Sequence, residues 1–406
     1  MNGRRTLGIN GLGRIGKLTL WYQLAHNDFD RFVVNIGRPV GRSLDSLAEY
    51  IAKDSTYGPL HRYLDGYRGK RSIEIVDTEA GILRIHGKEV VVLQEHRNPK
   101  DLPWSQHEVR IVVDGTGVFV DPHPGPEAPK GSLRGHLEGG AQVVLQTSAF
   151  KSKTQGWPKD SLTAIYGINH HQFEAGTHQI LAAASCTTTA LAHMMRPLLE
   201  RDLTRHMITA GMSTVHAATN SQNVLDGVPE AGAKDLRKTR SALSNVILTT
   251  TNAARALEQV MPEIRGIGFM ANSVRIPTST VSLIILNVTF QTDLTPDGKP
   301  SLDRQIINSI YREASQGESR GLVGFSEEQN VSQDMVGEDV AVYIEGCETH
   351  TRTGLIDIRL PNTAAESGRR AQIPVTHVTI FGWYDNELGS YSNRLGELTR
   401  YVSENL

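Results

Sequence analysis

Residues 6–16 read Thr-Leu-Gly-Ile-Asn-Gly-Leu-Gly-Arg-Ile-Gly, an apolar run that enters the pattern G-x-G-x-x-G. Apolar residues then recur at helical spacing as far as Ala25, and residues 31–36 are rich in β-branched and aromatic side chains. A strand, a glycine turn, a helix and a second strand make a βαβ unit, in which the glycines let a pyrophosphate approach the helix N-terminus. The stretch therefore predicts a dinucleotide site that uses Gly11, Gly13 and Gly16.

The end of the second predicted strand bears on the choice of cofactor. In dinucleotide-binding units, a carboxylate at this place accepts a hydrogen bond from the adenosine ribose. Residues 34–38 read Val-Asn-Ile-Gly-Arg, the next acid is Asp45, and Arg38 and Arg42 are available instead. Because an acid is missing and cations are near, we expect NADP to be tolerated or preferred. The alternative, that Arg38 is a solvated loop residue and NAD binds through other contacts, stays open.

Further strand-like runs predict the fold class of the first part of the chain. Residues 89–93, 109–113 and 141–145 are apolar and largely β-branched, and helical segments lie between the strands. This alternation predicts an α/β fold with a Rossmann-type, doubly wound parallel sheet. The turn at residues 114–117, which contains Thr116, is suited to the cofactor crevice.

Composition narrows the classes of function. The chain has 406 residues, a formal net charge of −2 and two cysteines, Cys186 and Cys347. That length allows two domains, and a charge near zero gives no general attraction to nucleic acid or to an anionic membrane. Two distant cysteines indicate a reducing compartment, and no apolar run approaches the roughly 20 residues of a membrane span. We therefore expect a cytoplasmic protein without nucleic-acid or membrane partners.

The segment from Ala182 to Leu191 contains Cys186 among small hydroxyl residues, between a strand-like run and a helical pattern. A cysteine at a helix N-terminus is favoured as the thiolate, because free N–H groups carry partial positive charge there. The alternative is an inert, buried cysteine. His216 follows at the end of a predicted strand and could hydrogen-bond the sulfur, although spacing alone does not pair the two.

The later strand-like runs differ from the earlier ones in arrangement. Residues 207–215, 268–276 and 281–290 indicate an α+β catalytic domain with a mixed or antiparallel sheet. The predicted domains are residues 1–184, completed by a C-terminal helix at 387–406, and residues 185–386.

Six motifs occur together: INGLGRIG, ASCTTTALA, STVHAAT, KDLRKTR, VRIPT and WYDNELGSYSNR. In these motifs and their order, the chain resembles phosphorylating glyceraldehyde-3-phosphate dehydrogenase over almost its whole length. The resemblance implies reversible oxidation of glyceraldehyde 3-phosphate, with NAD(P) and inorganic phosphate, to 1,3-bisphosphoglycerate, a reaction of glycolysis and gluconeogenesis. Cys186 would be the nucleophile, passing through a hemithioacetal and a thioester, and His216 the base.

The resemblance also implies binding residues and a quaternary structure. The cofactor would bind the backbone of Arg14 and Ile15 together with Ser148 and Asn386, the substrate phosphate would bind Thr219 and Arg240, and the attacking phosphate would bind Ser185, Thr187, Thr251 and the backbone at Asn252. Family members are commonly homotetramers, in which the loop at residues 221–241 meets a neighbouring subunit.

The chain departs from the family in ways that leave alternatives open. Thr189 and Ala190 replace the usual asparagine and cysteine after Ser-Cys-Thr-Thr, and extra sequence occurs near residues 61–71, 121–140 and 347–371. These changes indicate a divergent, longer subgroup. One alternative is an erythrose-4-phosphate dehydrogenase, in which water resolves the thioester. Another is a catalytically reduced relative with a regulatory or binding role.

Overall fold

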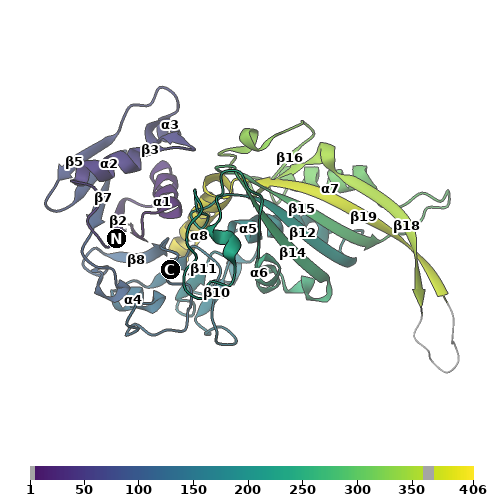
Figure 1. Ribbon diagram of the computed structural model, residues 1–406, viewed down its shortest axis with the longest axis horizontal. Helices are drawn as coiled ribbons and strands as arrows, with labels where there is room; N and C mark the ends of the chain where they lie inside the picture. The colour runs from purple at the N-terminus through teal and green to yellow at the C-terminus, as the bar shows by residue number, and fades with distance from the viewer. Residues whose placement is uncertain (1–4, 360–369) are drawn as a thin grey trace. The chain divides into compact units, whose positions relative to one another are not determined.

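The computed structural model describes residues 5–359 and 370–406. The chain divides into two compact units (Figure 1). The first runs to Ser185 and includes Glu387–Leu406, and the second comprises Cys186–Asn386. The C-terminal segment therefore returns to the unit in which the chain begins.

The first unit contains a nine-stranded sheet within the described residues. Its parallel strands are, in spatial order, β10 (Ser161–Thr163), β11 (Ile180–Ala182), β9 (Val143–Gln146), β8 (Val109–Asp114), β1 (Thr6–Asn10), β2 (Arg31–Asn35) and β7 (Lys88–Leu93). Two antiparallel strands, β6 (Ile82–Ile85) and β5 (Ile73–Asp77), extend the edge next to β7. The predicted Rossmann-type fold is confirmed, with an antiparallel extension that the sequence analysis did not include.

Helices and a small ribbon complete the first unit. They are α1 (Arg14–Ala25), α2 (Leu44–Ala52), α3 (Leu60–Asp65), α4 (Leu133–Glu138), α8 (Asn393–Glu404), the short helices η1 (Pro99–Asp101), η2 (His170–Gln172) and η7 (Leu388–Ser392), and the strand pair β3 (Lys53–Asp54) and β4 (Gly58–Pro59). Helix α1 lies against α3 and α8. Its Trp21 is fully buried and donates to the Ile51 carbonyl over 2.9 Å, so the indole is satisfied inside the core.

The second unit is built on an eight-stranded mixed sheet within the described residues. Its strands are, in spatial order, β13 (Ile247–Thr249), β14 (Gly268–Ile276), β12 (Met207–Ala217), β15 (Ser282–Gln291), β19 (Arg370–Tyr384), β17 (Val342–Glu345) and β16 (Val323–Ser326), with β18 (His350–Arg359) paired to β19. The β12–β14 and β16–β17 pairs are parallel, and the other pairs are antiparallel. The predicted α+β domain with a mixed sheet is confirmed.

Helices of the second unit pack against this sheet. They are α5 (Cys186–Leu199), α6 (Ala253–Val260) and α7 (Arg304–Gln316), with the short helices η3 (Leu236–Thr239), η4 (Pro262–Gly266), η5 (Ser332–Met335) and η6 (Gly346–Glu348). Helix α5 contacts β15, β17 and β19. Its Leu191, Met194 and Leu198 are fully buried, so α5 is held to the sheet along one apolar face.

The three stretches of extra sequence take different forms. The first contributes most of α3 and the residues that follow it, and the second forms a loop and α4. In the third, residues 360–369 lie outside the described residues. The described part of the third forms η6, β18 and the start of β19, a hairpin at the far end of the sheet in Figure 1.

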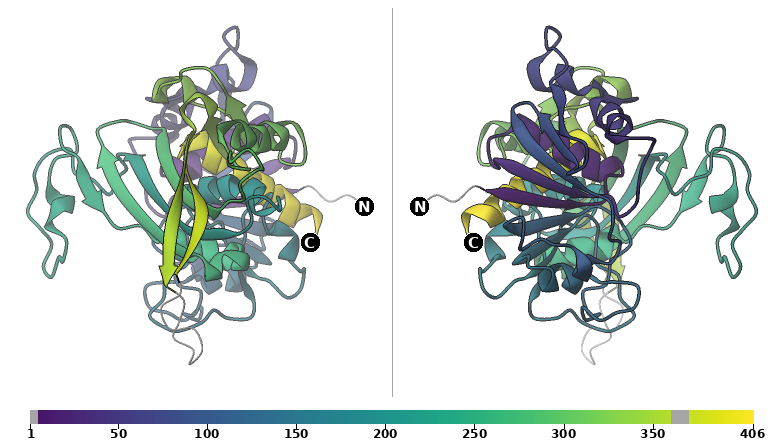
Figure 2. Two further views of the ribbon diagram at one scale, coloured as in Figure 1. Left: turned by 90° about the vertical axis from the view of Figure 1, so that its right-hand side faces the viewer. Right: turned by 90° about the vertical axis from the view of Figure 1, so that its left-hand side faces the viewer.

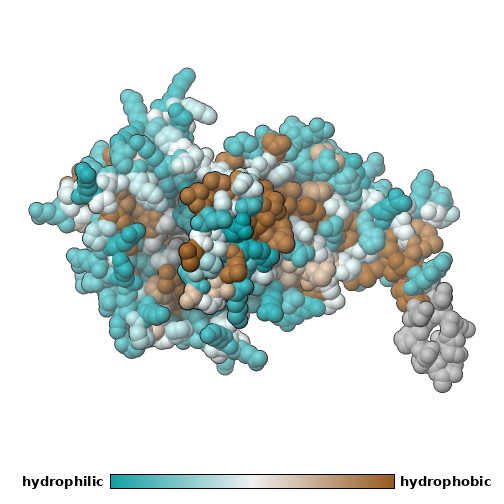
Figure 3. Space-filling model, in the orientation of Figure 1, coloured by the Kyte–Doolittle hydropathy of each residue, from teal (hydrophilic) through white to brown (hydrophobic). Residues whose placement is uncertain are grey.

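Residues 218–246 form an arm between β12 and β13 that stands away from the sheet (Figure 2). The arm exposes six large apolar side chains, those of Val224, Leu225, Val228, Leu236, Leu243 and Val246. Figure 3 shows further apolar residues at the surface of the second unit, over the strands of its sheet. Apolar side chains gathered at a surface mark a place of contact with another molecule.

Asp54 carries a buried charge in the first unit. Its carboxylate accepts hydrogen bonds from Lys17, over 2.7 Å, and from Arg14, and its other oxygen accepts from the Thr56 backbone N–H over 2.9 Å. Burial alone raises the pKa of Asp54, but the donors, Lys17 first, outweigh it and lower the pKa to about 2. The ionised form is therefore stabilised by folding.

Replacement of Asp54 by asparagine should destabilise the fold by about 3 kcal/mol at pH 7, because it leaves the buried Lys17 ammonium without its carboxylate partner. The folded pKa lies below that of the unfolded chain, about 3.9. The stabilisation is therefore present above about pH 4 and is lost as the pH falls towards 2. Urea unfolding at several pH values checks this, with exposed Asp202→Asn as the control. A difference from the wild type that stays constant down to pH 2 would contradict it.

Candidate functional site

Cys186 begins helix α5 directly after a strained turn. Ala184 has a φ of 55°, a left-handed conformation that costs an alanine about 1–2 kcal/mol, and its carbonyl accepts a hydrogen bond from Tyr391 over 3.2 Å. The half-buried thiol lies in the first turn of α5, where backbone N–H groups have no partner inside the helix. The turn therefore presents the sulfur at a helix N-terminus, as predicted from the sequence.

His216 is the nearest described base to that sulfur. It lies near the end of β12, is 3% exposed, and its Nε2 is 3.5 Å from the Cys186 Sγ. Its Nδ1 is 2.8 Å from the Ala217 carbonyl oxygen. A proton on Nδ1 can be donated to this carbonyl, and Nε2 is then free to accept the thiol proton. The arrangement suits a nucleophile and its general base.

Arg275 is a third group of the site. Strands β12 and β14 run parallel with His216 opposite Arg275. The Nη1 of Arg275 contacts the His216 Nδ1 and donates to the Ala217 carbonyl over 3.1 Å. Its Nε is buried and has no hydrogen-bond partner among the described residues. The site therefore holds a fixed cation with a free donor, which is what an anionic substrate requires.

Arg275 lies in the motif VRIPT, but its role was not predicted from the sequence. A charged side chain inside a run predicted to be a sheet strand was the available signal. The strand register that places Arg275 beside His216 could not be read from the sequence.

The pKa of the Cys186 thiol shifts in the opposite direction to the one predicted from its position at a helix N-terminus. Burial raises the pKa of the Cys186 thiol, although Arg275 and hydrogen bonds from Thr187 oppose the rise. Burial, together with the neighbouring Arg275, also lowers the pKa of His216 to about 3. Both directions favour a neutral thiol beside a neutral imidazole. The predicted fall of the thiol pKa is therefore wrong for this structure, because desolvation outweighs the helix start.

Tyr384 connects α5 with the strand that carries His216. Its buried hydroxyl lies 3.0 Å from the Thr187 Oγ1 and 2.8 Å from the Thr214 Oγ1. Its ring meets the His216 ring edge to face, with centroids 6.0 Å apart and an interplanar angle of 79°. One aromatic side chain thus contacts both the base and a hydroxyl beside the nucleophile, a role that was not predicted for Tyr384 although it lies in the motif WYDNELGSYSNR.

Ser282 links the base to a predicted cofactor contact. Its buried hydroxyl accepts a hydrogen bond from the Ala217 N–H over 3.1 Å and donates to the Asn386 Oδ1 over 2.9 Å. The preceding Val281 has a φ of 62°, which is strained for a β-branched residue. The bond from Ser282 fixes Asn386 with its NH2 group available as a donor. No signal in the sequence pointed to Ser282.

The predicted phosphate ligands lie on several elements. Thr187, 6% exposed, follows Cys186 in α5, and half-buried Ser185 precedes it. On the arm, the Thr219 Oγ1 is 3.0 Å from the Ser221 Oγ, and the Arg240 Nε donates to Asp226 over 2.9 Å. The remaining two are Thr251, whose Oγ1 accepts from the Ala253 N–H over 3.2 Å, and Asn252, the N-cap of α6. Their roles in binding phosphate stay predictions, and Arg240 is paired with a carboxylate here.

The glycine motif shapes a crevice of about 580 Å³ in the first unit. Gly11 has a φ of 88°, and a Cβ at Gly16 would lie 1.9 Å from the Gly11 carbonyl oxygen. The crevice lies at the carboxyl ends of β1, β2 and β8, where parallel α/β sheets bind ligands. Its lining residues in the described chain are Gly11, Leu12, Gly13, Ile36, Arg38, Val40, Gly41, Ser46, Leu47, Tyr50, Gly115 and Thr116.

The lining suits a dinucleotide, and it includes four of the predicted cofactor residues, Gly11, Gly13, Arg38 and Thr116. Among the lining residues just named, Arg38 is a cation and none is a carboxylate, whereas Arg42 lines a different hollow. The guanidinium of Arg14 is bound by Asp54 and Glu387, so only the backbone of Arg14 and Ile15 is available to a pyrophosphate. The Ser148 hydroxyl accepts from Gln146 over 2.6 Å after β9.

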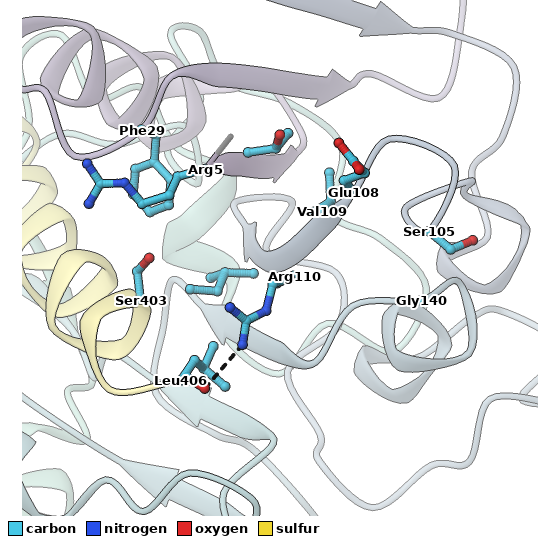
Figure 4. Close-up of a pocket in the computed structure, with 11 residues that line it drawn as sticks. Arg5, Phe29, Ser105, Glu108, Val109, Arg110, Gly140, Ser403 and Leu406 are labelled. Atoms are coloured by element: carbon cyan, nitrogen blue, oxygen red, sulfur yellow. Dashed lines mark hydrogen bonds between the residues drawn. The ribbon is translucent and has the colours of Figure 1, made fainter. Parts of the chain in front are cut away.

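A second cavity of the first unit, of about 390 Å³, is lined by residues at the amino ends of central strands of the sheet (Figure 4). Arg5, Phe29, Arg110 and Leu406 are among its lining residues, and Arg110 donates to the Leu406 carbonyl over 3.2 Å. Arg5 and Arg110 lie at the amino ends of β1 and β8. We therefore assign the cofactor to the glycine crevice and not to this cavity.

No helix in residues 5–359 and 370–406 combines the length and the apolar character needed to cross a bilayer.

Comparison with known proteins agrees with this geometry. Residues 5–122 match the domain described as "Glyceraldehyde 3-phosphate dehydrogenase, NAD binding domain", and residues 185–359 match "Glyceraldehyde 3-phosphate dehydrogenase, C-terminal domain". The chain is 32% identical over 398 residues to glyceraldehyde-3-phosphate dehydrogenase 1 of Bacillus cereus, with 98% of each chain covered. It is 30% identical over 405 residues to the cytosolic glyceraldehyde-3-phosphate dehydrogenase of Chlamydomonas reinhardtii, covering 100% of this chain and 98% of the relative. The chain therefore belongs to the glyceraldehyde-3-phosphate dehydrogenase family.

Proposed function

We propose that the protein is a phosphorylating aldehyde dehydrogenase that oxidises glyceraldehyde 3-phosphate, with NAD(P) and inorganic phosphate, to 1,3-bisphosphoglycerate. The observation that carries the proposal is the Cys186 thiol 3.5 Å from the His216 Nε2, with the Arg275 guanidinium beside them. A nucleophile, a base and a fixed cation are the groups that covalent oxidation of a phosphorylated aldehyde requires.

The chemistry of the second unit follows from these three groups. The Cys186 sulfur attacks the aldehyde carbon while His216 takes the thiol proton and passes it to the aldehyde oxygen, which gives a neutral hemithioacetal and a neutral imidazole. His216 then accepts the hydroxyl proton as hydride leaves the same carbon, and a thioester on Cys186 remains. A bound nicotinamide supplies the acceptor for that hydride. Attack of inorganic phosphate on the thioester releases the acyl phosphate and returns the thiol.

Anion binding is the second requirement of the reaction. Arg275 supplies a cation beside the base, and its buried Nε has no partner among the described residues. The Thr187 hydroxyl is oriented by Tyr384 next to the nucleophile. By resemblance to the family, Thr219 and Arg240 bind the substrate phosphate, and Ser185, Thr187, Thr251 and Asn252 bind the attacking phosphate.

For the cofactor, we propose that NADP is accepted at least as well as NAD. Arg38 lines a crevice whose lining, in the described chain, contains no carboxylate that would repel a 2′-phosphate. Arg38 is exposed, so NAD binding through the remaining contacts is the competing reading.

We also propose a homotetramer in the cytoplasm. The exposed apolar side chains of the arm support contact between subunits, since burying them would remove apolar surface from water. Two free cysteines suit a reducing compartment.

One assay tests the proposed reaction against its alternatives. The purified protein is given glyceraldehyde 3-phosphate or erythrose 4-phosphate, with NAD or NADP, with and without inorganic phosphate. We expect phosphate-dependent reduction of the cofactor with the three-carbon substrate, at about 1 per second or faster. Phosphate-independent turnover of erythrose 4-phosphate would instead indicate hydrolysis of the thioester. Absence of turnover under all conditions would favour a regulatory or binding relative.

A further inference from the structure

A second hollow, of about 530 Å³, adjoins the glycine crevice. The two share Gly11, Ile36, Arg38 and Thr116 as lining residues, so they are continuous at the end of β2. The remaining lining residues in the described chain are Asn10, Asn35, Gly37, Arg97, Val118, Phe119 and Lys130. Three of all these residues are cations, Arg38, Arg97 and Lys130, and none is a carboxylate. We call this hollow the cationic recess.

We propose that the cationic recess binds the 2′-phosphate of NADP through Arg38, Arg97 and Lys130, which makes the enzyme NADP-preferring. This inference rests on the proposed dinucleotide-dependent function. Of the two cations that the sequence had indicated, Arg38 lines the recess and Arg42 does not, and the inference adds Arg97 and Lys130 to Arg38 in one hollow at the carboxyl end of β2.

Arg97 is held in position by the backbone of the turn after β2. Its Nε donates to the Gly37 carbonyl over 3.1 Å, which leaves both Nη groups to other partners. Gly37 has a φ of 70°, and a Cβ there would lie 3.1 Å from the Arg97 Cγ. Asn35 fixes the same turn by accepting from the Gly37 N–H over 3.2 Å. The aliphatic part of the Arg97 side chain therefore packs against this turn. The planar guanidinium of Arg97 has the geometry to donate two hydrogen bonds to a phosphate.

Lys130 comes from the second stretch of extra sequence. The loop that carries it is anchored at both sides, because Ser132 donates to the Gly125 carbonyl over 2.9 Å and Lys100 pairs with Glu127 over 2.8 Å. Gly131, next to Lys130, has a φ of 82°, and a Cβ there would lie 2.7 Å from the Cδ of Pro99. The loop is thus packed on the segment that follows Arg97, and it presents Lys130 to the recess.

Charge then decides which cofactor the recess favours. A phosphate monoester carries a charge of about −1.5 to −2 at pH 7. This negative charge is opposite in sign to the three cations of the cationic recess, which has no carboxylate among its lining residues in the described chain. A ribose hydroxyl is neutral and would leave the repulsion among the three cations uncompensated. The acid nearest in sequence to Arg97 is Glu95, whose carboxylate lies 3.8 Å from His96 and is not among the lining residues. We therefore expect preference for NADP, weakening as salt screens the exposed charges.

Binding of two nucleotide probes tests the inference apart from turnover. By calorimetry at low salt, the wild-type enzyme should bind 2′,5′-ADP at least about tenfold more tightly than 5′-AMP. This ratio is the contribution to affinity that we expect from one charge-assisted hydrogen bond. Arg97→Ala and Lys130→Ala should each weaken binding of 2′,5′-ADP by about tenfold and change that of 5′-AMP less than about twofold. Lys151→Ala, an exposed cation outside the recess, should change neither.

The outcomes separate this inference from the proposed function. Equal affinity for the two probes, or wild-type affinity for 2′,5′-ADP in both recess variants, would contradict binding of the 2′-phosphate by the cationic recess. Neither result would contradict the proposed dehydrogenase reaction. If neither probe binds and the substrate assay shows no turnover, the proposed function fails, and the recess with it. Thermal unfolding of each variant, expected within about 2 °C of wild type for surface substitutions, excludes misfolding as the cause of a loss.

Discussion

The Cys186→Ser enzyme should lose at least about 10⁴-fold of its turnover while it binds cofactor like the wild type. A serine hydroxyl keeps the position of the thiol, but it holds its proton far more tightly. His216, whose pKa is lowered to about 3, cannot take that proton effectively. The attack on the aldehyde therefore fails, whereas the glycine crevice, which belongs to the other unit, is unchanged. Steady-state rates and cofactor titration by fluorescence measure the two properties separately.

Cys347 provides the matched control for this substitution. It is the second free cysteine, and burial, followed by the hydrogen bond that its thiol donates to the Glu345 carboxylate over 3.1 Å, raises its pKa to about 11. Cys347→Ser should retain turnover within about twofold, as expected of a half-exposed site away from the reaction. If Cys186→Ser keeps turnover and Cys347→Ser loses it, the nucleophile has been assigned to the wrong cysteine.

Parts of the fold were predictable because their signals are local. The glycine turn of residues 11–16 needs left-handed backbone at Gly11 and close packing at Gly16, and both requirements appear in the sequence as glycine. Parallel strands such as β2 and β8 bury both faces, so they appear as continuous apolar runs. The Rossmann-type fold follows from such features without knowledge of distant contacts.

The order of strands in the second unit was less predictable. Residues 268–276 and 281–290 are separated by a short connection, which favours direct pairing of the two strands. In the structure, β12 lies between them and pairs with β14 in parallel and with β15 in antiparallel. Val281, with its φ of 62°, lies in the connection that makes this possible. A short apolar run predicts that a strand exists but does not predict which strand will pair with it.

The site shows the same division between local and distant information. The cysteine at a helix start could be predicted, because the helix begins at the next residues along the chain. The partners Arg275 and Tyr384 reach His216 through strand register and through contacts across 59 and 168 residues, which no local pattern encodes. The pKa of the Cys186 thiol is raised by burial, which depends on packing that no local pattern encodes, so its direction was beyond prediction from the sequence.

Replacement of His216 by asparagine should lower kcat/KM by about 10²–10⁴-fold, the usual contribution of a general base. Asparagine approximates the shape of the ring but cannot accept the thiol proton, so the reaction must rely on hydroxide. We therefore expect the remaining activity of the variant to rise by about tenfold per pH unit at neutral and mildly alkaline pH. The wild type should show a shallower dependence, because the neutral base is already in place when the pKa of His216 is about 3.

His193 supplies the control, because it is also a buried histidine of the second unit and its ring lies 2.8 Å from the Thr189 carbonyl on α5. His193→Asn should leave the shape of the pH profile unchanged, even if packing losses lower the stability of the variant. The same steep rise with pH in His193→Asn would show that the profile reports general damage to the unit. A His216→Asn enzyme with the rate and pH profile of the wild type would contradict the assignment of His216 as the general base. Among the described residues, no other base lies within 3.5 Å of the sulfur and contacts both a backbone carbonyl and a guanidinium.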